Sequence, residues 1–156
     1  MATINAAISV TSDVTGYGTT INNSMTMTKA GTIAGLDQAT GLVRKTLTST
    51  NEVDLLVVGA GVVADVTATK SAKLYIKNVN TDSSEYFTVG LGKASGGAAK
   101  QALSVAASDV RSVEIGRLYS GDWMIIPWVA ASDEHDVFVK PSVSTSMVIE
   151  YMVFFE

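Results

Sequence analysis

LYIKNVNTDSSEYFTVGL, residues 74–91, is the stretch of sequence that decides the fold. Its first part, 74–79, is apolar and rich in β-branched and aromatic residues, which is typical of a β-strand. The polar run 80–84 then predicts a turn. Successive side chains of a strand point to opposite faces, so the remainder would gather three apolar residues on one face: Phe87, Val89 and Leu91. We therefore expect two antiparallel strands joined as a hairpin.

The same period-two alternation recurs along most of the chain. In 4–11 and 21–28 it places aliphatic or methionine side chains on one face and mainly Asn, Ser and Thr on the other. Further strands are expected at 42–48, 53–58, 110–118, 123–129, 136–140 and 146–155. Helical spacing is poor. The best helix candidate, 98–107, lies in a Gly-, Ala- and Ser-rich excursion that we expect over 90–109.

The strand pattern indicates the fold class. About nine or ten short strands at near-regular spacing predict an all-β protein. We expect an antiparallel two-sheet sandwich, jelly-roll-like, over residues 21–156, and an extended N-terminal arm over residues 1–20. A length of 156 residues suits one such domain with its own core.

Composition argues against several classes of function. The chain is 47% hydrophobic and 17% charged, which is too apolar for disorder. It lacks cysteine, so disulfides, thiol nucleophiles and cysteine zinc sites are excluded. A formal net charge of -4 with scattered basic residues argues against a nucleic-acid partner. Because no apolar run reaches the roughly 18–20 residues that span a bilayer, and no secretory signal is visible, we expect no membrane partner.

One segment imitates a cofactor site. Residues 54–65, DLLVVGAGVVAD, match the dinucleotide fingerprint of an apolar strand, G-x-G-x-x-A and an acid. The fingerprint needs a helix whose N-terminus faces the pyrophosphate. Here poor helix formers follow, and the next predicted strand begins by Leu74, which leaves too little chain for that helix. We interpret Gly59 and Gly61 as a glycine bend at a strand end and predict no cofactor.

The turn Asp133-Glu134-His135-Asp136 contains the one histidine of the chain. Its oxygen ligands would suit calcium, but adjacent residues in a turn rarely converge on one point, so we favour a solvated turn and predict no metal site. With a single imidazole and no G-x-S-x-G elbow, the sequence predicts no catalytic residue and a protein that is not an enzyme. A carboxylate pair for glycoside hydrolysis stays open, because a separation in space cannot be read from sequence.

Two predicted strands are apolar on both faces. In 123–129, alternation separates Trp123, Ile125 and Pro127 from Met124, Ile126 and Trp128. Pro127 cannot donate to a ladder, which favours an edge strand. The segment 146–155 is apolar on both faces in the same way. One small sandwich does not easily cover two such strands, so we expect partial exposure to a partner subunit. The predicted interface residues are Trp123, Ile125, Pro127, Trp128, Met152 and Phe154.

Several stretches carry a family resemblance: LYIKNVN (74–80), YFTVGLG (86–92), LYSGD (118–122), WMIIP (123–127), DVFVK (136–140) and the apolar 147–155. With them the chain resembles, over about residues 72–156, the small jelly-roll virion structural proteins of tailed bacteriophages. Ser120 and Asp122 depart from the proline and glutamate usual in the Leu-x-Pro-Gly-Glu-like turn of that family. The resemblance implies a sandwich that decorates or cements a capsid, or belongs to a tail or fibre assembly, and it implies no catalytic residue.

We therefore expect a capsid cement or decoration protein on the virion surface, assembled in the host cytoplasm and bound to the major capsid protein shell. We expect a homo-oligomer, with a trimer as the first choice, and a short N-terminal arm laid along the sheet edge of a neighbour. The rival hypothesis is a carbohydrate- or receptor-binding jelly-roll module of a phage tail or fibre. Its sugar platform would consist of Trp123, Trp128, Tyr119 and the turn 133–136.

Overall fold

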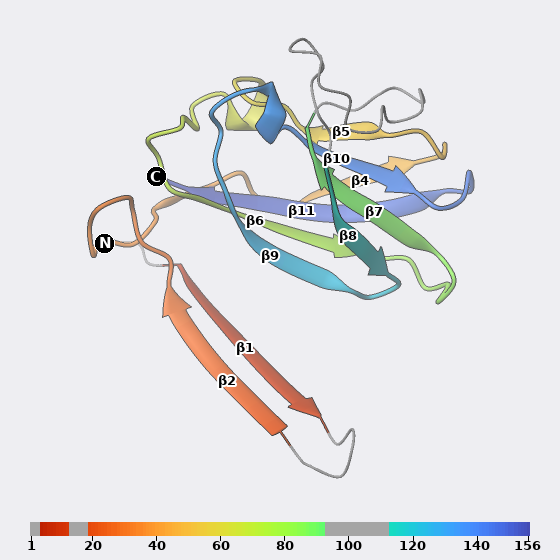
Figure 1. The fold of residues 1–156 in the computed structure, drawn as a ribbon, viewed down its shortest axis with the longest axis horizontal. Helices are drawn as coiled ribbons and strands as arrows, with labels where there is room; N and C mark the ends of the chain where they lie inside the picture. The colour runs from red at the N-terminus through yellow and green to blue at the C-terminus, as the bar shows by residue number, and fades with distance from the viewer. Residues whose placement is uncertain (1–3, 13–18, 93–112) are drawn as a thin grey trace.

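The structure, a computed structural model, describes residues 4–12, 19–92 and 113–156 (Figure 1). The described strands are β1 (Asn5–Ser12), β2 (Thr19–Thr26), β3 (Gln38–Ala39), β4 (Val43–Leu47), β5 (Val53–Leu56), β6 (Ala72–Asn78), β7 (Tyr86–Leu91), β8 (Val113–Tyr119), β9 (Trp123–Trp128), β10 (Val137–Pro141) and β11 (Met147–Phe155). Short 3-10 turns occur at η2 (Gly61–Val63) and η3 (Asp133–His135). Of the excursion expected over 90–109, residues 93–109 lie outside the described residues, as does the helix candidate 98–107.

Two antiparallel sheets pack face to face, which confirms the predicted all-β sandwich. A five-stranded sheet has the order β3-β11-β6-β9, with β4 also paired to β11, and a four-stranded sheet has the order β5-β10-β7-β8. From β4 to β11 the chain changes sheet at every connection except the one between β7 and β8. This connectivity of eight strands is that of a jelly roll.

The core lies between the two sheets, and the alternation seen in the sequence places it there. In β6, Leu74 and Ile76 are completely buried, whereas Tyr75 between them points to the opposite face. Side chains of both sheets meet in this core, among them Phe87, Val89, Val137, Val139, Ile149 and Val153.

The predicted hairpin over 74–91 is wrong, although both of its strands are present. β6 pairs with β11 and β9, whereas β7 pairs with β10 and β8, so the turn between β6 and β7 crosses from one sheet to the other. The physical reason is that both strands have an apolar face, and these faces meet across the core instead of lying side by side. Asn78, completely buried at the end of β6, bridges the sheets because its Nδ2 donates to the carbonyl of Leu118 in β8 at 3.0 Å.

β1 and β2 form a hairpin that projects from the sandwich (Figure 1). Their register runs without a shift from the pair Asn5 and Thr26 to the pair Ser12 and Thr19. The arm boundary predicted at residue 20 therefore falls inside β2. Met27, only 2% exposed, anchors the hairpin, and its N–H donates to the carbonyl of Ile4 at 2.9 Å.

Candidate functional site

The face of the five-stranded sheet that points away from the core, here called the outer face, is apolar over three neighbouring strands. β6, β9 and β11 pair side by side, and alternate residues of each point outward. Apart from the buried Glu150, these residues are partly buried or exposed, whereas the inward residues between them in β6 and β11 are buried. The apolar and aromatic members of the outer face are Tyr75, Trp123, Ile125, Pro127, Met152 and Phe154.

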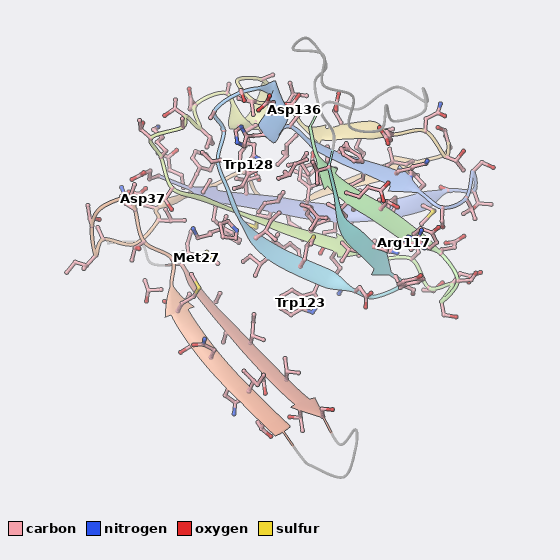
Figure 2. The ribbon with its side chains drawn as sticks, in the orientation of Figure 1. Met27, Asp37, Arg117, Trp123, Trp128 and Asp136 are labelled. Carbon is pink, nitrogen blue, oxygen red and sulfur yellow. The ribbon has the colours of Figure 1, made fainter. Side chains whose placement is uncertain are left out.

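Trp123 is the most prominent side chain of this face. It is 49% exposed (Figure 2). Its ring lies 6.4 Å from that of Tyr75, centroid to centroid, at a tilt of 38°. The tilted arrangement is one that aromatic pairs favour. An exposed tryptophan held by a neighbouring ring has the properties of an interface anchor, because its large apolar area is already ordered before a partner binds.

A polar group lies beside these rings. Glu150 of β11 is buried, and its Oε2 accepts a hydrogen bond from Nε of Arg44 on β4 at 2.8 Å. Burial, followed by the charge and the hydrogen-bonding effect of the nearby Glu150 carboxylate, raises the pKa of Tyr75 above its ordinary value of 10.0. On this face Glu150 lies directly opposite Arg44 of β4 and Lys77 of β6, so the carboxylate is flanked by two basic side chains beside the aromatic rings.

The raised pKa of Tyr75 predicts a loss of stability in alkali. Above about pH 10 the unfolded chain loses the phenolic proton that the folded chain still holds, so the free energy of unfolding falls as pH rises. Below that pH both states keep the proton, and Tyr75 adds no pH dependence. Tyr75→Phe is expected to flatten this alkaline decline in urea unfolding curves. Any alkaline decline that remains in the variant is assigned to Tyr151, because burial also raises the pKa of that residue. Equal slopes in the variant and the wild type would contradict the assignment.

The β1–β2 hairpin has one apolar and one polar face, as the alternation predicts. Directly opposed residues of an antiparallel pair share a face, so the register gathers Ala6, Ile8, Val10, Ile21 and Met25 on one side, together with one amide, Asn23, opposite Ile8. The other side carries Asn5, Ser9, Thr11, Thr20, Asn22, Ser24 and Thr26. Ile8, Val10, Ile21 and Met25 are all exposed, so this apolar face is largely uncovered.

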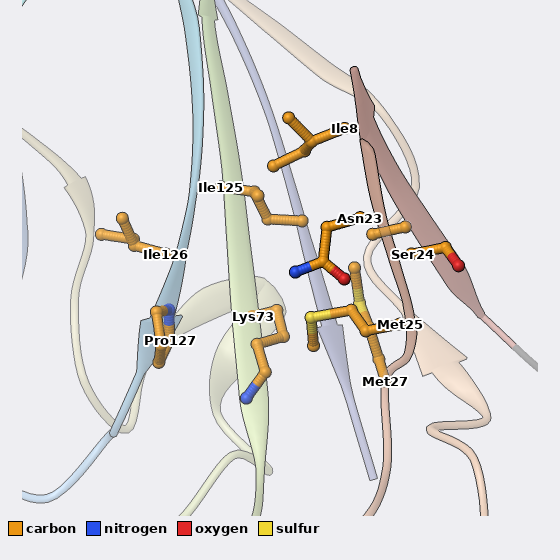
Figure 3. Close-up of a pocket in the computed structure, with 10 residues that line it drawn as sticks. Ile8, Asn23, Ser24, Met25, Met27, Lys73, Ile125, Ile126 and Pro127 are labelled. Atoms are coloured by element: carbon orange, nitrogen blue, oxygen red, sulfur yellow. The ribbon is translucent and has the colours of Figure 1, made fainter. Parts of the chain in front are cut away.

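Two cavities separate the hairpin from the outer face. One of about 140 Å³ is lined from the hairpin by Ile8 and Met25 and from the sheet by Lys73, Ile125 and Pro127 (Figure 3). Its walls are almost entirely apolar. A second cavity, of about 360 Å³, lies at the base of the hairpin over Tyr75, Glu150, Met152 and Phe154. Hairpin and outer face together thus form one concave apolar surface.

The structure brings together five of the six predicted interface residues. Trp123, Ile125 and Pro127 lie on the outward side of β9, an edge strand among the described strands, as the proline predicts. Met152 and Phe154 share this outer face. The placement of Trp128 at the interface is wrong. Trp128 is 5% exposed and belongs to the core, where its Nε1 donates to the carbonyl of His135 at 2.8 Å.

The residues of the expected sugar platform do not converge. Trp128 is in the core, and Tyr119 lies in β8 of the four-stranded sheet with its ring 5.2 Å from that of Tyr86. In the turn 133–136, the carboxylate of Asp136 is buried and accepts a hydrogen bond from the N–H of Val58 at 2.7 Å. Over the described residues, no group of three His, Asp or Glu side chains could hold a metal ion.

The segment with the dinucleotide fingerprint forms a glycine bend. Gly59 and Gly61 have φ of 71° and 59°, a region that favours glycine, and they lead into the single 3-10 turn η2. Between β5 and β6, every residue of which is described, no α-helix follows these glycines. The backbone arrangement that binds a pyrophosphate is therefore not formed there.

No protein-family model matches the chain, and no curated protein matches it either. The resemblance to phage virion proteins thus rests on the sequence pattern of residues 72–156. None of the helices that the structure describes has the length and apolar character needed to cross a membrane.

Sequence reasoning missed Tyr75, Glu150 and the hairpin residues as parts of this site. The signal for Tyr75 was present, because it alternates with two aliphatic residues that form the core. The signal for Ile8 and Met25 was also present in the alternation of the first strands. What the sequence did not indicate is that the hairpin and the outer face lie against each other.

Proposed function

We propose that this chain is a non-enzymatic virion structural protein, a capsid cement or decoration protein of a tailed bacteriophage. In this proposal the outer face and the hairpin bind the shell of the major capsid protein, and the protein acts on the capsid surface after assembly in the host cytoplasm. The observation that carries the proposal is the concave apolar surface formed by the outer face and the hairpin, with the exposed Trp123 on the same outer face. The sequence resemblance supports the choice of partner.

The surface has the composition of a protein interface. Its exposed members are aromatic or aliphatic, with methionine and proline, and the one buried acid is already paired with Arg44. Docking would therefore remove apolar area from water, provided that the ammonium groups of Lys73 and Lys77 on the same face reach solvent or an acidic group of the partner. The hydroxyl- and amide-rich face of the hairpin would remain available for hydrogen bonds to neighbouring subunits.

Trp123→Ser is expected to weaken binding to purified capsid shells of the encoding phage more than tenfold, because a tryptophan anchor contributes about 2 kcal/mol or more. Co-sedimentation of the protein with these shells measures the binding. The matched control is Tyr119→Ser, which removes a 43% exposed aromatic side chain from the four-stranded sheet and is expected to bind as the wild type. If the wild-type protein does not sediment with the shells, the proposed function is wrong.

A second candidate is the carbohydrate- or receptor-binding module of a tail or fibre. The observation that favours it is the pair of rings, Trp123 and Tyr75, next to the carboxylate of Glu150. Aromatic rings can stack on a sugar ring, and a carboxylate can accept hydrogen bonds from its hydroxyl groups. Titration of the protein with cell-surface glycans separates the two functions. Quenching of tryptophan fluorescence by a sugar that Trp123→Ser abolishes would favour this candidate.

A further inference from the structure

The β1–β2 hairpin has the properties of an incomplete sheet. Among the described residues, each of its strands pairs with the other and with no further strand. A two-stranded hairpin is marginally stable in water, and three or more strands with an apolar face are needed for independent stability. The hairpin lies against the sandwich over its inner half, where Met27 is buried and where Ile8 and Met25 line a cavity with the outer face. Its outer half needs another partner.

The edges of this hairpin lack the features that usually prevent pairing with another chain. Neither strand contains a charged residue or a proline, and the ladder of eight residue pairs has no bulge. Val10 and Ile21, at the outer end of the apolar face, are 49% and 55% exposed. They line neither cavity, so the outer face of the five-stranded sheet of the same chain does not cover them.

We propose that two copies of this chain pair through the free edges of β1, antiparallel about a two-fold axis, to form a four-stranded sheet. The register places Ile8 opposite Ile8 of the second copy and Ala6 opposite Val10, because directly opposed residues share a face and this choice joins the two apolar faces. This pairing does not depend on the proposed function, since it needs no capsid.

The two-fold axis explains how the outer half of each hairpin becomes covered. An axis perpendicular to the sheet keeps both apolar faces on one side, the side on which both sandwiches lie. Antiparallel pairing then sets the tip of one hairpin beside the base of the other, over the outer face of the second copy. In Figure 2, Trp123 lies on the β1 side of the hairpin, which is the side that the second copy would occupy. The second hairpin would thus lie on the side where the outer face exposes Trp123.

The area and the charge of the join bear on this pairing. Each β1 edge is about 26 Å long and about 10 Å thick, so the two paired edges alone remove roughly 500 Å² from water. A stable interface needs about 1,000 Å², so the pairing also requires the contact of each hairpin with the outer face of the other copy. The uncharged strands bring no like charges together at the join, although each chain has a net charge of -4.

Light scattering on the full chain is the first test. The expected mass is twice the 16.3 kDa of one chain. Ile8→Asp would place two like charges directly opposite each other, and it is expected to reduce the mass to one chain while the melting temperature of the sandwich is unchanged, because Ile8 is outside the core. A wild-type mass of one chain, or of the three chains expected from the sequence, would overturn the inference and leave the capsid proposal untouched.

Cross-linking tests the register. The chain contains no cysteine, so Ile8→Cys introduces a single thiol that faces its own copy across the ladder at a distance suited to a disulfide. Mild oxidation is expected to convert most of this variant to a covalent dimer. Ile33→Cys, whose side chain is 98% exposed in the loop between β2 and β3, is the control and is expected to remain mostly monomeric on a denaturing gel. Equal cross-linking of both variants would contradict the pairing.

Discussion

Asn78→Ala is expected to lower the free energy of unfolding by about 3 kcal/mol, because it leaves buried polar groups of both sheets without partners. The Asn78 side chain is completely buried. Its Nδ2 donates to the carbonyls of Leu118 at 3.0 Å and Glu85 at 3.4 Å, and its Oδ1 accepts from the N–H of Asn80 at 3.0 Å. One amide thus joins the end of β6 to β8 and to the residue just before β7, at the end of the sandwich where the chain changes sheet.

The effect at Asn78 reaches further because the neighbouring turn depends on the same strand end. The backbone of Asn78 donates to the carbonyl of Asp122 and accepts from the N–H of Gly121, both at 3.0 Å. Asn80 in turn accepts a hydrogen bond from the N–H of Val148 at 2.9 Å. Networks of this kind are cooperative, so the loss of one member weakens the others.

Urea unfolding of Asn78→Ala measures this effect directly. The matched control is Asn22→Ala, which makes the same replacement at an exposed position on the polar face of the hairpin and is expected to change stability by less than about 0.5 kcal/mol. A loss below about 1 kcal/mol for Asn78→Ala would show that water replaces the amide at this junction.

Gly90→Ala is expected to cost about 3 kcal/mol through overpacking. A Cβ at Gly90 would overlap the ring of Phe138 and the carbonyl oxygen of Val113. Phe138 is completely buried on β10, directly opposite Gly90, so neither partner has room to move. The missing side chain at residue 90 is therefore the space that the Phe138 ring occupies.

A double-mutant cycle tests this assignment. Phe138→Ala alone is expected to cost about 3–5 kcal/mol through the cavity that it leaves. Because the new methyl group of Gly90→Ala would lie in that cavity, the double variant is expected to lose clearly less than the sum of the single losses. The control is Gly116→Ala in β8, where a Cβ meets nothing within 4 Å and the stability should be unchanged or slightly higher. Additive losses would contradict the contact.

The positions of the strands could be predicted from the sequence, whereas their partners could not. Alternation is a local signal, and it correctly placed β6, β7, β9 and β11. Pairing is decided by which apolar faces meet in space. A short polar turn such as 80–84 serves a hairpin and a crossing between sheets equally well, and the buried amide of Asn78 that fixes the crossing looks like an ordinary turn residue in the sequence.

The candidate site divides in the same way. Pro127 and the two-sided apolar pattern indicated an exposed edge strand with an apolar outward face, and five of the six named residues lie on that outer face. The interface prediction for Trp128 was wrong because the sequence of a strand that is apolar on both faces does not reveal which face packs on the core. The cavity between Met25 and Ile125 brings together segments a hundred residues apart, and no local pattern predicts such a contact.

The jelly-roll order also has a consequence for the timing of assembly. β11 lies between β4 and β6, and its contact with β4 through Arg44 and Glu150 joins residues 106 positions apart. A ribosome adding about 5–20 residues per second makes β4 some 5–20 s before its partner exists. The five-stranded sheet, and with it the outer face, forms only after the last described strand has been synthesised. The outer face therefore does not exist as a binding surface until β11 has been synthesised, and β4 lacks its strand partner until then.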